Sequence, residues 1–174
     1  HGDQEQQGAA LQAMRGRVDG LLVMSPYAGA GFLVDNLPAA LPTVLINTPL
    51  PEGDYPGFGI DDHAGAMAMT RYLLASGHRR LAFIAGPDSN HDARERLRGF
   101  RDAVAVACAG VEGRVLPGGF DEASGHRAGM ALLQGGSLPD AVFAANDMMA
   151  LGCLYAFSQA GVKEAELLIA VTNH

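Results

Sequence analysis

The feature that most constrains the fold is an alternation along the whole chain between apolar runs of strand length and stretches with a helical pattern. Four of the runs are apolar throughout, which is typical of strands buried on both faces of a parallel sheet: LLVM, LAFIA, AVFAA and LLIAV. Strands separated by helices of roughly 13 to 18 residues form right-handed βαβ units. We therefore predict an α/β fold, in which helices flank parallel sheets.

The predicted strands are 18–24, 43–46, 80–85, 114–116, 141–145 and 168–171, with a short extended stretch at 59–61. The predicted helices are 4–16, 32–37, 62–76, 92–109, 121–133 and 147–159. Residues 49–57 form a Pro/Gly-rich loop without periodicity, and this loop is the best candidate for a boundary between lobes. We predict a partial N-terminal lobe over residues 1–60 and a C-terminal lobe over 61–174.

The charge balance is acidic, with 12 Lys and Arg against 19 Asp and Glu, for a formal charge of −7. A surface that binds DNA normally clusters positive charge, because it must displace counterions from phosphates. The nearest cluster is Arg94, Arg98 and Arg101 on one predicted helix, where a solvated face is the simpler interpretation. We therefore expect these residues not to contact DNA.

The sequence contains little that would indicate an enzyme or a metalloprotein. Cys108 and Cys153 both lie in apolar helical runs, where small buried thiols are expected, and the six histidines lack metal-ligand spacing. Gly29-Ala30-Gly31 lacks the third glycine of a dinucleotide fingerprint, and nothing forms a nucleophile–base pair. We expect no cofactor, no metal and no catalysis. Neither a signal peptide nor a membrane span is evident, so a cytoplasmic location is expected.

Ligands of doubly wound sheets bind beyond the carboxyl ends of the strands, where the connecting loops diverge. This rule selects the loops at 25–27, 47–48, 87–92, 118–121 and 146–147. They contain three polar candidates for contact with a ligand, namely Asn47, Asp92 and Asn146. Asp92 also has a glutamate three residues later, the spacing of a capping box.

Arg96 is the most informative side chain. Leu97, Phe100 and Val104 define the buried side of its predicted helix, and Arg96 falls on the flank, roughly 60° from the centre of that face. A guanidinium held there must find acceptors, because an unpaired buried charge is very costly. Either a structural carboxylate or the polar groups of a ligand could supply them.

Asn146 and Phe120 have two interpretations each. Asn146 opens a helix, so it is expected to cap that helix, and its side chain also stands where a ligand would arrive. Phe120 lies in a Gly-Gly-Phe-Asp turn after a strand. Its ring could stack on a sugar or a base, or it could pack against its own lobe.

The segment 148–160 (MMALGCLYAFSQA) contains no charged residue. A helix with one face in water should carry a polar stripe, so the outer face is expected to be covered as well. A second subunit would cover it most simply. Burial inside one chain is the open alternative.

Several motifs occur in a familiar order. They are VDGLL at 18–22, PTVLI at 42–46, GHRRLAFIAGP at 77–87, RLRGF at 96–100 and PDAVFAANDMMALG at 139–152. Together they resemble the sensing core of lactose-repressor-type (LacI/GalR) transcription factors over nearly the whole chain. The resemblance implies a periplasmic-binding-protein-like fold, with two Rossmann-like lobes and a ligand cleft between them.

The resemblance also implies roles for single residues. Arg96 would hydrogen-bond an effector, Phe120 would stack on it, and Asn146 would contact it. Asn47 stands where the family often has an Asp, so a polar contact there would be altered. Leu151 would lie on a dimer face, and we assign Met148 and Tyr155 on the same helix to that interface.

The chain also departs from the family pattern. Nothing corresponds to the DNA-reading headpiece or to the first strand–helix–strand of the sensing core, and the last strand runs into Thr172-Asn173-His174 where the family has G-F-D. We therefore expect an incomplete ligand site. The predicted function is that of a ligand-responsive transcriptional regulator, a homodimer that senses a sugar, a nucleoside or a similar small polar metabolite and binds operator DNA through a headpiece outside this chain. The alternative is a periplasmic sugar-binding protein of a transport system.

Overall fold

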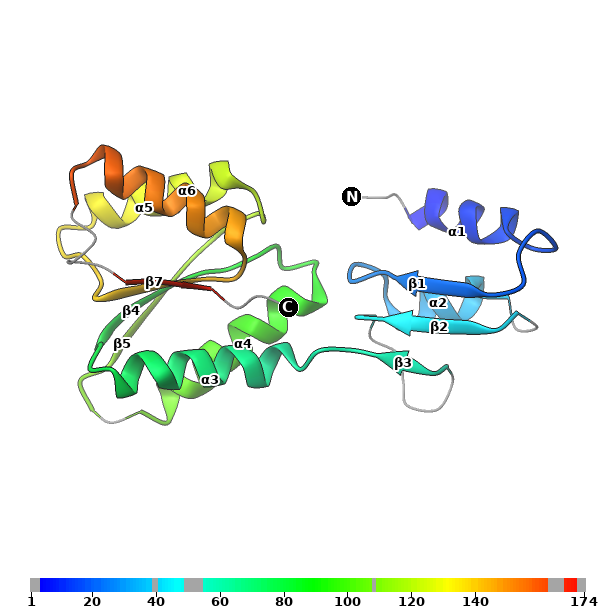
Figure 1. Ribbon diagram of the computed structural model, residues 1–174, viewed down its shortest axis with the longest axis horizontal. Helices are drawn as coiled ribbons and strands as arrows, with labels where there is room; N and C mark the ends of the chain where they lie inside the picture. The colour runs from blue at the N-terminus through cyan, green and yellow to red at the C-terminus, as the bar shows by residue number, and fades with distance from the viewer. Residues whose placement is uncertain (1–3, 39–40, 49–54, 108, 163–167, 172–174) are drawn as a thin grey trace. The chain divides into compact units, whose positions relative to one another are not determined.

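The computed structural model describes residues 4–38, 41–48, 55–107, 109–162 and 168–171. The chain divides into two compact units, His1–Ile60 and Asp61–His174. Figure 1 labels the elements of each unit.

The N-terminal unit is a small parallel sheet with two helices. Its elements are α1 (Gln4–Ala13), β1 (Leu21–Met24), α2 (Ala30–Asn36), β2 (Thr43–Ile46) and β3 (Gly57–Phe58), and its strand order is β1-β2-β3. A cluster of five buried residues forms its core: Leu21, Ala28, Leu33, Leu37 and Leu45.

Four predictions for this unit need correction. The first helix ends at Ala13, and the extended stretch lies at Gly57–Phe58, two residues before its predicted start. The first strand begins only at Leu21, and it is not buried on both faces, because Leu22 is 74% exposed. Alternate residues of a strand point to opposite faces, and the described part of this unit covers only the face that holds Leu21. Most of the predicted boundary loop, 49–54, lies outside the described residues.

The C-terminal unit contains four helices and four strands: α3 (Asp62–Ala75), β4 (Arg80–Ile84), α4 (His91–Ala105), β5 (Glu112–Leu116), α5 (Glu122–Gln134), β6 (Ala141–Ala144), α6 (Asp147–Gln159) and β7 (Leu168–Val171). All strand pairs are parallel, in the order β5-β4-β6-β7. Helices α3 and α4 cover one face of the sheet, and α5 and α6 cover the other (Figure 1). The predicted α/β class is confirmed.

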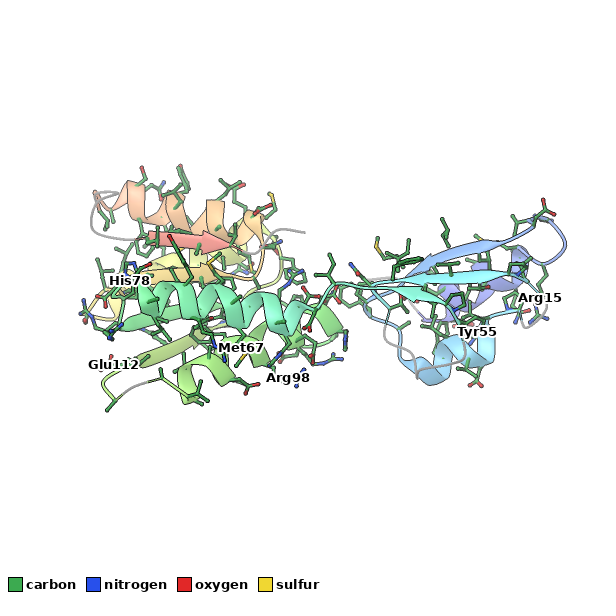
Figure 2. The ribbon with its side chains drawn as sticks, turned by 60° about the horizontal axis from the view of Figure 1, so that its bottom comes forward. Arg15, Tyr55, Met67, His78, Arg98 and Glu112 are labelled. Carbon is green, nitrogen blue, oxygen red and sulfur yellow. The ribbon has the colours of Figure 1, made fainter. Side chains whose placement is uncertain are left out.

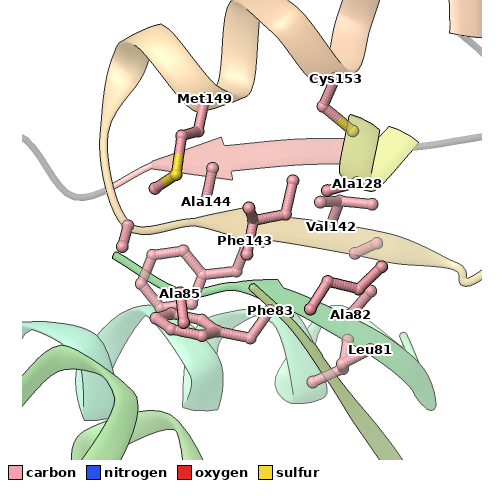
Figure 3. Packing of buried hydrophobic residues seen from close by; sticks show 14 of the residues in the cluster. Leu81, Ala82, Phe83, Ala85, Ala128, Val142, Phe143, Ala144, Met149 and Cys153 are labelled. Atoms are coloured by element: carbon pink, nitrogen blue, oxygen red, sulfur yellow. The ribbon is translucent and has the colours of Figure 1, made fainter. Parts of the chain in front are cut away.

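The two central strands of this sheet carry the core. Phe83 of β4 stacks on Phe100 of α4, with 4.9 Å between ring centroids, and it meets Phe143 of β6 edge to face at 5.0 Å. Figure 3 shows these strands beneath Met149 and Cys153 of α6. Burial raises the pKa of the Cys153 thiol to about 12, so this free cysteine is the inert apolar residue that was expected. Cys108 lies outside the described residues.

The buried face of α4 differs from the prediction. It consists of Ala93, Arg96, Gly99, Phe100 and Ala103. Of the three large apolar residues predicted to define it, Leu97 and Val104 are only half-buried. Small residues allow α4 to approach α3 closely, since a Cβ on Gly99 would overlap the carbonyl oxygen of His63. Arg96 therefore lies within the buried face, and not on its flank.

The start of α4 also differs, because Asn90 caps the helix and its Oδ1 accepts the N–H of Ala93 at 2.9 Å. The capping box predicted at Asp92 is wrong, and Asp92 lies in the first turn. The helix ends at Ala105, four residues before its predicted end. Arg98, labelled in Figure 2, lies with Arg94 and Arg101 on the exposed face, as the sequence indicated.

Helix α6 is buried on one side only. Met149, Gly152, Cys153, Ala156 and Phe157 face the core. The opposite side is apolar and exposed, at Met148, Leu151, Leu154 and Tyr155. In the part of the chain that the structure describes, this side of the helix stays uncovered.

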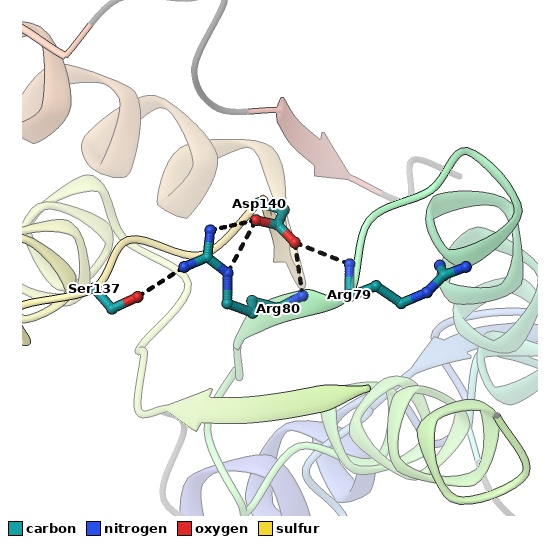
Figure 4. A network of polar contacts seen from close by, with 4 residues as sticks. All are labelled: Arg79, Arg80, Ser137 and Asp140. Atoms are coloured by element: carbon teal, nitrogen blue, oxygen red, sulfur yellow. Dashed lines mark hydrogen bonds and ion pairs between the residues drawn. The ribbon is translucent and has the colours of Figure 1, made fainter. Parts of the chain in front are cut away.

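The amino ends of β4 and β6 are joined by an ion-paired network (Figure 4). Asp140 Oδ1 accepts hydrogen bonds from Arg80 Nε and Nη2 at 3.1 and 2.6 Å, and Oδ2 accepts the backbone N–H groups of Arg79 and Arg80 at 3.0 and 2.9 Å. Burial by itself raises the pKa of Asp140, but these hydrogen bonds outweigh it and lower the pKa to about 2. The network therefore fixes the edge of the sheet at which β4 and β6 begin.

Candidate functional site

The strand order places a topological switch point in the C-terminal unit. The chain goes from β4 to β5 on one side and then returns past β4 to β6 on the other. Neighbouring loops diverge where the winding direction reverses, and ligands of doubly wound sheets bind at the carboxyl ends of those two strands. The candidate site is therefore the edge where β4 and β6 end.

Arg96 and Asp62 form a buried ion pair at this edge. Arg96 Nε donates to Asp62 Oδ1 at 2.8 Å, and Arg96 Nη1 donates to the backbone oxygen of Ala145, just after β6, at 2.6 Å. Arg96 is 5% exposed and Asp62 is 7% exposed. The guanidinium thus links the first turn of α3, the buried face of α4 and the carboxyl end of β6.

This geometry bears on the two interpretations of Arg96. A structural carboxylate does supply an acceptor, as one of them requires. Nη2, however, has no acceptor among the residues that the structure describes. Arginine has five N–H donors, and a buried donor without a partner carries a desolvation cost. Arg96 therefore keeps hydrogen-bonding capacity beyond its structural role.

Asn146 directly follows Ala145, whose carbonyl accepts the hydrogen bond from Arg96, and it uses both ends of its amide. Its Oδ1 accepts the N–H of Met149 at 3.0 Å, which is the predicted cap of α6. Its Nδ2 donates to the carbonyl oxygen of Phe120, also at 3.0 Å. The side chain therefore joins the loop after β5 to the start of α6.

Phe120 takes a left-handed backbone conformation, with a φ of 66°. This conformation is strained for a residue with a side chain, and the Asn146 hydrogen bond helps to hold it. The ring is half-buried, and it occupies the space that a Cβ on Gly86 would need. The ring therefore packs against its own unit.

The structure brings Arg96, Asn146 and Phe120 together, because the first binds the carbonyl of Ala145 and the second binds the carbonyl of Phe120. Asp92 is half-buried and lies one turn before Arg96 on α4. Asn47 belongs to the N-terminal unit, where it follows β2 with a φ of 44° and donates its backbone N–H to Phe58 at 2.9 Å.

The sequence alone did not identify Asp62 as the partner of Arg96. Its position in a first turn does favour a negative charge. The additional signal was the buried arginine on the following helix, which required an acceptor. Asn90 was also missed, although it precedes the apolar part of α4 in the usual position of a cap.

The described part of the chain contains no group of three His, Cys, Asp or Glu side chains that could hold a metal ion. None of its helices is both long enough and apolar enough to cross a bilayer.

Comparison with known proteins places the chain in a family. Residues 70–168 match the periplasmic binding protein-like domain. The regulator GalR of Salmonella typhimurium is 34% identical over 166 residues, and the repressor PurR of Klebsiella pneumoniae is 34% identical over 165. These alignments cover 93% and 92% of this chain, and the chain spans about half (48%) of each relative.

A solved structure of a LacI-family transcriptional regulator from Mycobacterium smegmatis is 27% identical. The alignment covers 98% of this chain and 63% of that one, with a TM-score of 0.78. These relatives are transcriptional regulators and not enzymes. The parallel sheets and the family match agree, and the chain belongs to the periplasmic binding protein-like domain family and is similar to regulators of the LacI/GalR type.

Proposed function

We propose that this chain is the effector-sensing part of a ligand-responsive transcriptional regulator, most simply a repressor. The observation that carries the proposal is the buried guanidinium of Arg96 at the switch point, which keeps donors at Nη2 after its structural bonds are made. A ligand hydroxyl or carbonyl at this edge would satisfy them. The kinship with GalR and PurR supports the same role for the whole protein.

In this proposal Arg96 donates to the effector, and Asn146 and Asp92 provide polar groups beside it. Phe120 provides a half-buried aromatic ring, and Asn47 is a separate candidate contact within the N-terminal unit. Sugars and nucleosides suit such a site, because they combine an apolar face with many donors and acceptors. The effector acts by differential affinity for two conformations of the regulator, since only that difference can shift their populations.

The proposal includes a homodimer that contacts operator DNA through a segment outside this chain, in the cytoplasm. The exposed side chains of Met148, Leu151, Leu154 and Tyr155 support α6 as the dimer face. They recur every three or four residues, so they form one apolar stripe on the helix. Monomeric soluble proteins rarely leave such a contiguous patch exposed.

A thermal-shift screen tests the sensing function. The purified protein is melted with each member of a panel of uncharged sugars, polyols, nucleosides and nucleobases. A ligand that binds only the folded state raises the melting temperature in proportion to the logarithm of its concentration above Kd. We expect a concentration-dependent rise for one chemical class, whereas a melting temperature unchanged across the panel would count against the proposal.

A further inference from the structure

From the charges at the switch-point edge, we infer that the effector is an uncharged polar molecule and that Asp62 is the residue that excludes phosphorylated or carboxylated ligands. This inference rests on the proposed function. It narrows the ligand class at the same site, which the kinship with other regulators leaves open.

The first step concerns the arginine. A guanidinium at a ligand site is usually a recognition group for carboxylate or phosphate, which it binds through two parallel hydrogen bonds. Here the Nε side of Arg96 is already bound to Asp62 at 2.8 Å. Nη1 donates to the neutral carbonyl of Ala145. The positive charge is thus compensated by a carboxylate that is itself more than nine-tenths buried.

The second step concerns the helix N-termini. Four helices of this unit begin at the same edge, and free N–H groups at such ends can bind phosphate. Each end is already capped, by Asp61, Asn90, Asp121 and Asn146 in chain order. Each helix also carries a carboxylate in its first turn, at Asp62, Asp92, Glu122 and Asp147. These carboxylates offset the positive ends of the helix dipoles.

The third step adds the charges. An anionic ligand bonded to Nη2 would lie near the Asp62 carboxylate in a poorly solvated environment. Like charges brought together at an interface cost several kcal/mol. A hydroxyl or carbonyl group would accept the same hydrogen bond without this repulsion. The pair therefore leaves the donors of Arg96 usable and removes the net charge that would attract an anion.

Matched ligand pairs provide the test. Each uncharged sugar is titrated beside its own phosphate ester and a carboxylate that keeps the ring, and adenosine is titrated beside its monophosphate. The sets are glucose, glucose 6-phosphate and glucuronate; galactose, galactose 1-phosphate and galacturonate; adenosine and adenosine monophosphate. Ionic strength is matched with sodium chloride. We expect the charged derivative to bind at least tenfold more weakly than its uncharged parent in the pair that binds.

A second arm removes the carboxylate. In Asp62→Asn the charge of Arg96 is no longer compensated, so inorganic phosphate should raise the melting temperature of this variant relative to matched chloride. Phosphate should leave the wild type unchanged. The control is Asp121→Asn, which removes one charge from the same edge and keeps a capping side chain, and which should respond as the wild type does.

The outcomes separate the two claims. An anionic derivative that binds more tightly than its parent would overturn the inference and leave the sensing function intact. Equal phosphate stabilisation of the wild type and Asp62→Asn would also overturn it, because Asp62 would then not be the excluding group. Absence of binding by every pair would overturn the proposed function, and the inference would fall with it.

Discussion

Breaking the Asp62–Arg96 pair one residue at a time should destabilise the protein far more than removing both residues together. Arg96→Met leaves the Asp62 carboxylate buried without its guanidinium, and Asp62→Leu leaves the guanidinium without its carboxylate. Removing one partner of a buried ion pair costs about 3–5 kcal/mol. Each single variant should therefore lose a large part of a typical stability of about 5–15 kcal/mol.

The double variant Asp62→Leu/Arg96→Met removes both charges. Its main residual cost is the Ala145 carbonyl, which loses the 2.6 Å hydrogen bond from Nη1. An unsatisfied buried acceptor costs about 1–3 kcal/mol. If the two residues contributed independently, the double variant would lose about 6–10 kcal/mol of unfolding free energy, which is the sum of the two single losses. The double variant should fall short of this sum by at least about 3 kcal/mol, which is the coupling energy of the pair.

Urea unfolding followed by circular dichroism measures these losses as changes in the free energy of unfolding. Arg94→Met is the control, because Arg94 is an exposed arginine on the same helix and its loss should cost less than about 0.5 kcal/mol. Additive losses, or single losses below about 1 kcal/mol, would show that the pair is not buried and coupled as described.

Three further predictions follow from the same unit. Gly152→Ala should destabilise the protein by more than about 2 kcal/mol in urea unfolding, because the new Cβ would overlap the carbonyl oxygen of Glu122. The control is Gly65→Ala on α3, where the new Cβ meets open space, and this variant should stabilise the protein by up to about 1 kcal/mol. The pKa of Asp140 is held at about 2, below its unfolded value of about 4, so its stabilisation of at most about 2 kcal/mol is present above pH 4 and is lost as the pH falls through 2. Stability of Asp140→Asn should then depend less on pH over this window, and an unchanged acid dependence would exclude this role. Leu151→Glu should convert dimers to monomers in sedimentation velocity, and an unchanged profile would remove α6 from the interface.

Much of the C-terminal unit could be predicted from the sequence because three of its four strands, β4, β6 and β7, are short and largely apolar runs. The bounds of α6 and β7 agree with the prediction at both ends, and α3 ends within one residue of it. Gly77, with a φ of 97°, follows α3 as a left-handed residue at a helix end should. Local signals of this kind need no knowledge of the rest of the fold.

The predictions that were wrong concern features that depend on tertiary contacts. Large apolar residues misplaced the centre of the buried face of α4, because the close contact with α3 selects small residues such as Gly99. The partner of Arg96 lies 34 residues earlier in the chain, and spacing within one helix cannot reveal it. The strand that contains Leu22 was predicted to be buried on both faces, but Leu22 is exposed. An apolar run indicates a strand, but it does not reveal whether other parts of the described chain pack on both of its faces.

A direct test of the account is the affinity of the protein for an uncharged ligand from the screen, measured by isothermal titration calorimetry before and after loss of the Arg96 guanidinium. The double variant Asp62→Leu/Arg96→Met keeps the site free of an unpaired buried charge, and Arg80→Met removes an arginine from the ion pair at the opposite edge of the sheet. We expect the double variant to bind the ligand at least about tenfold more weakly than the wild type, because it loses a hydrogen bond from a charged donor. Arg80→Met should bind the ligand as the wild type does. Wild-type affinity in the double variant would contradict the account, because Arg96 would then be a structural residue alone.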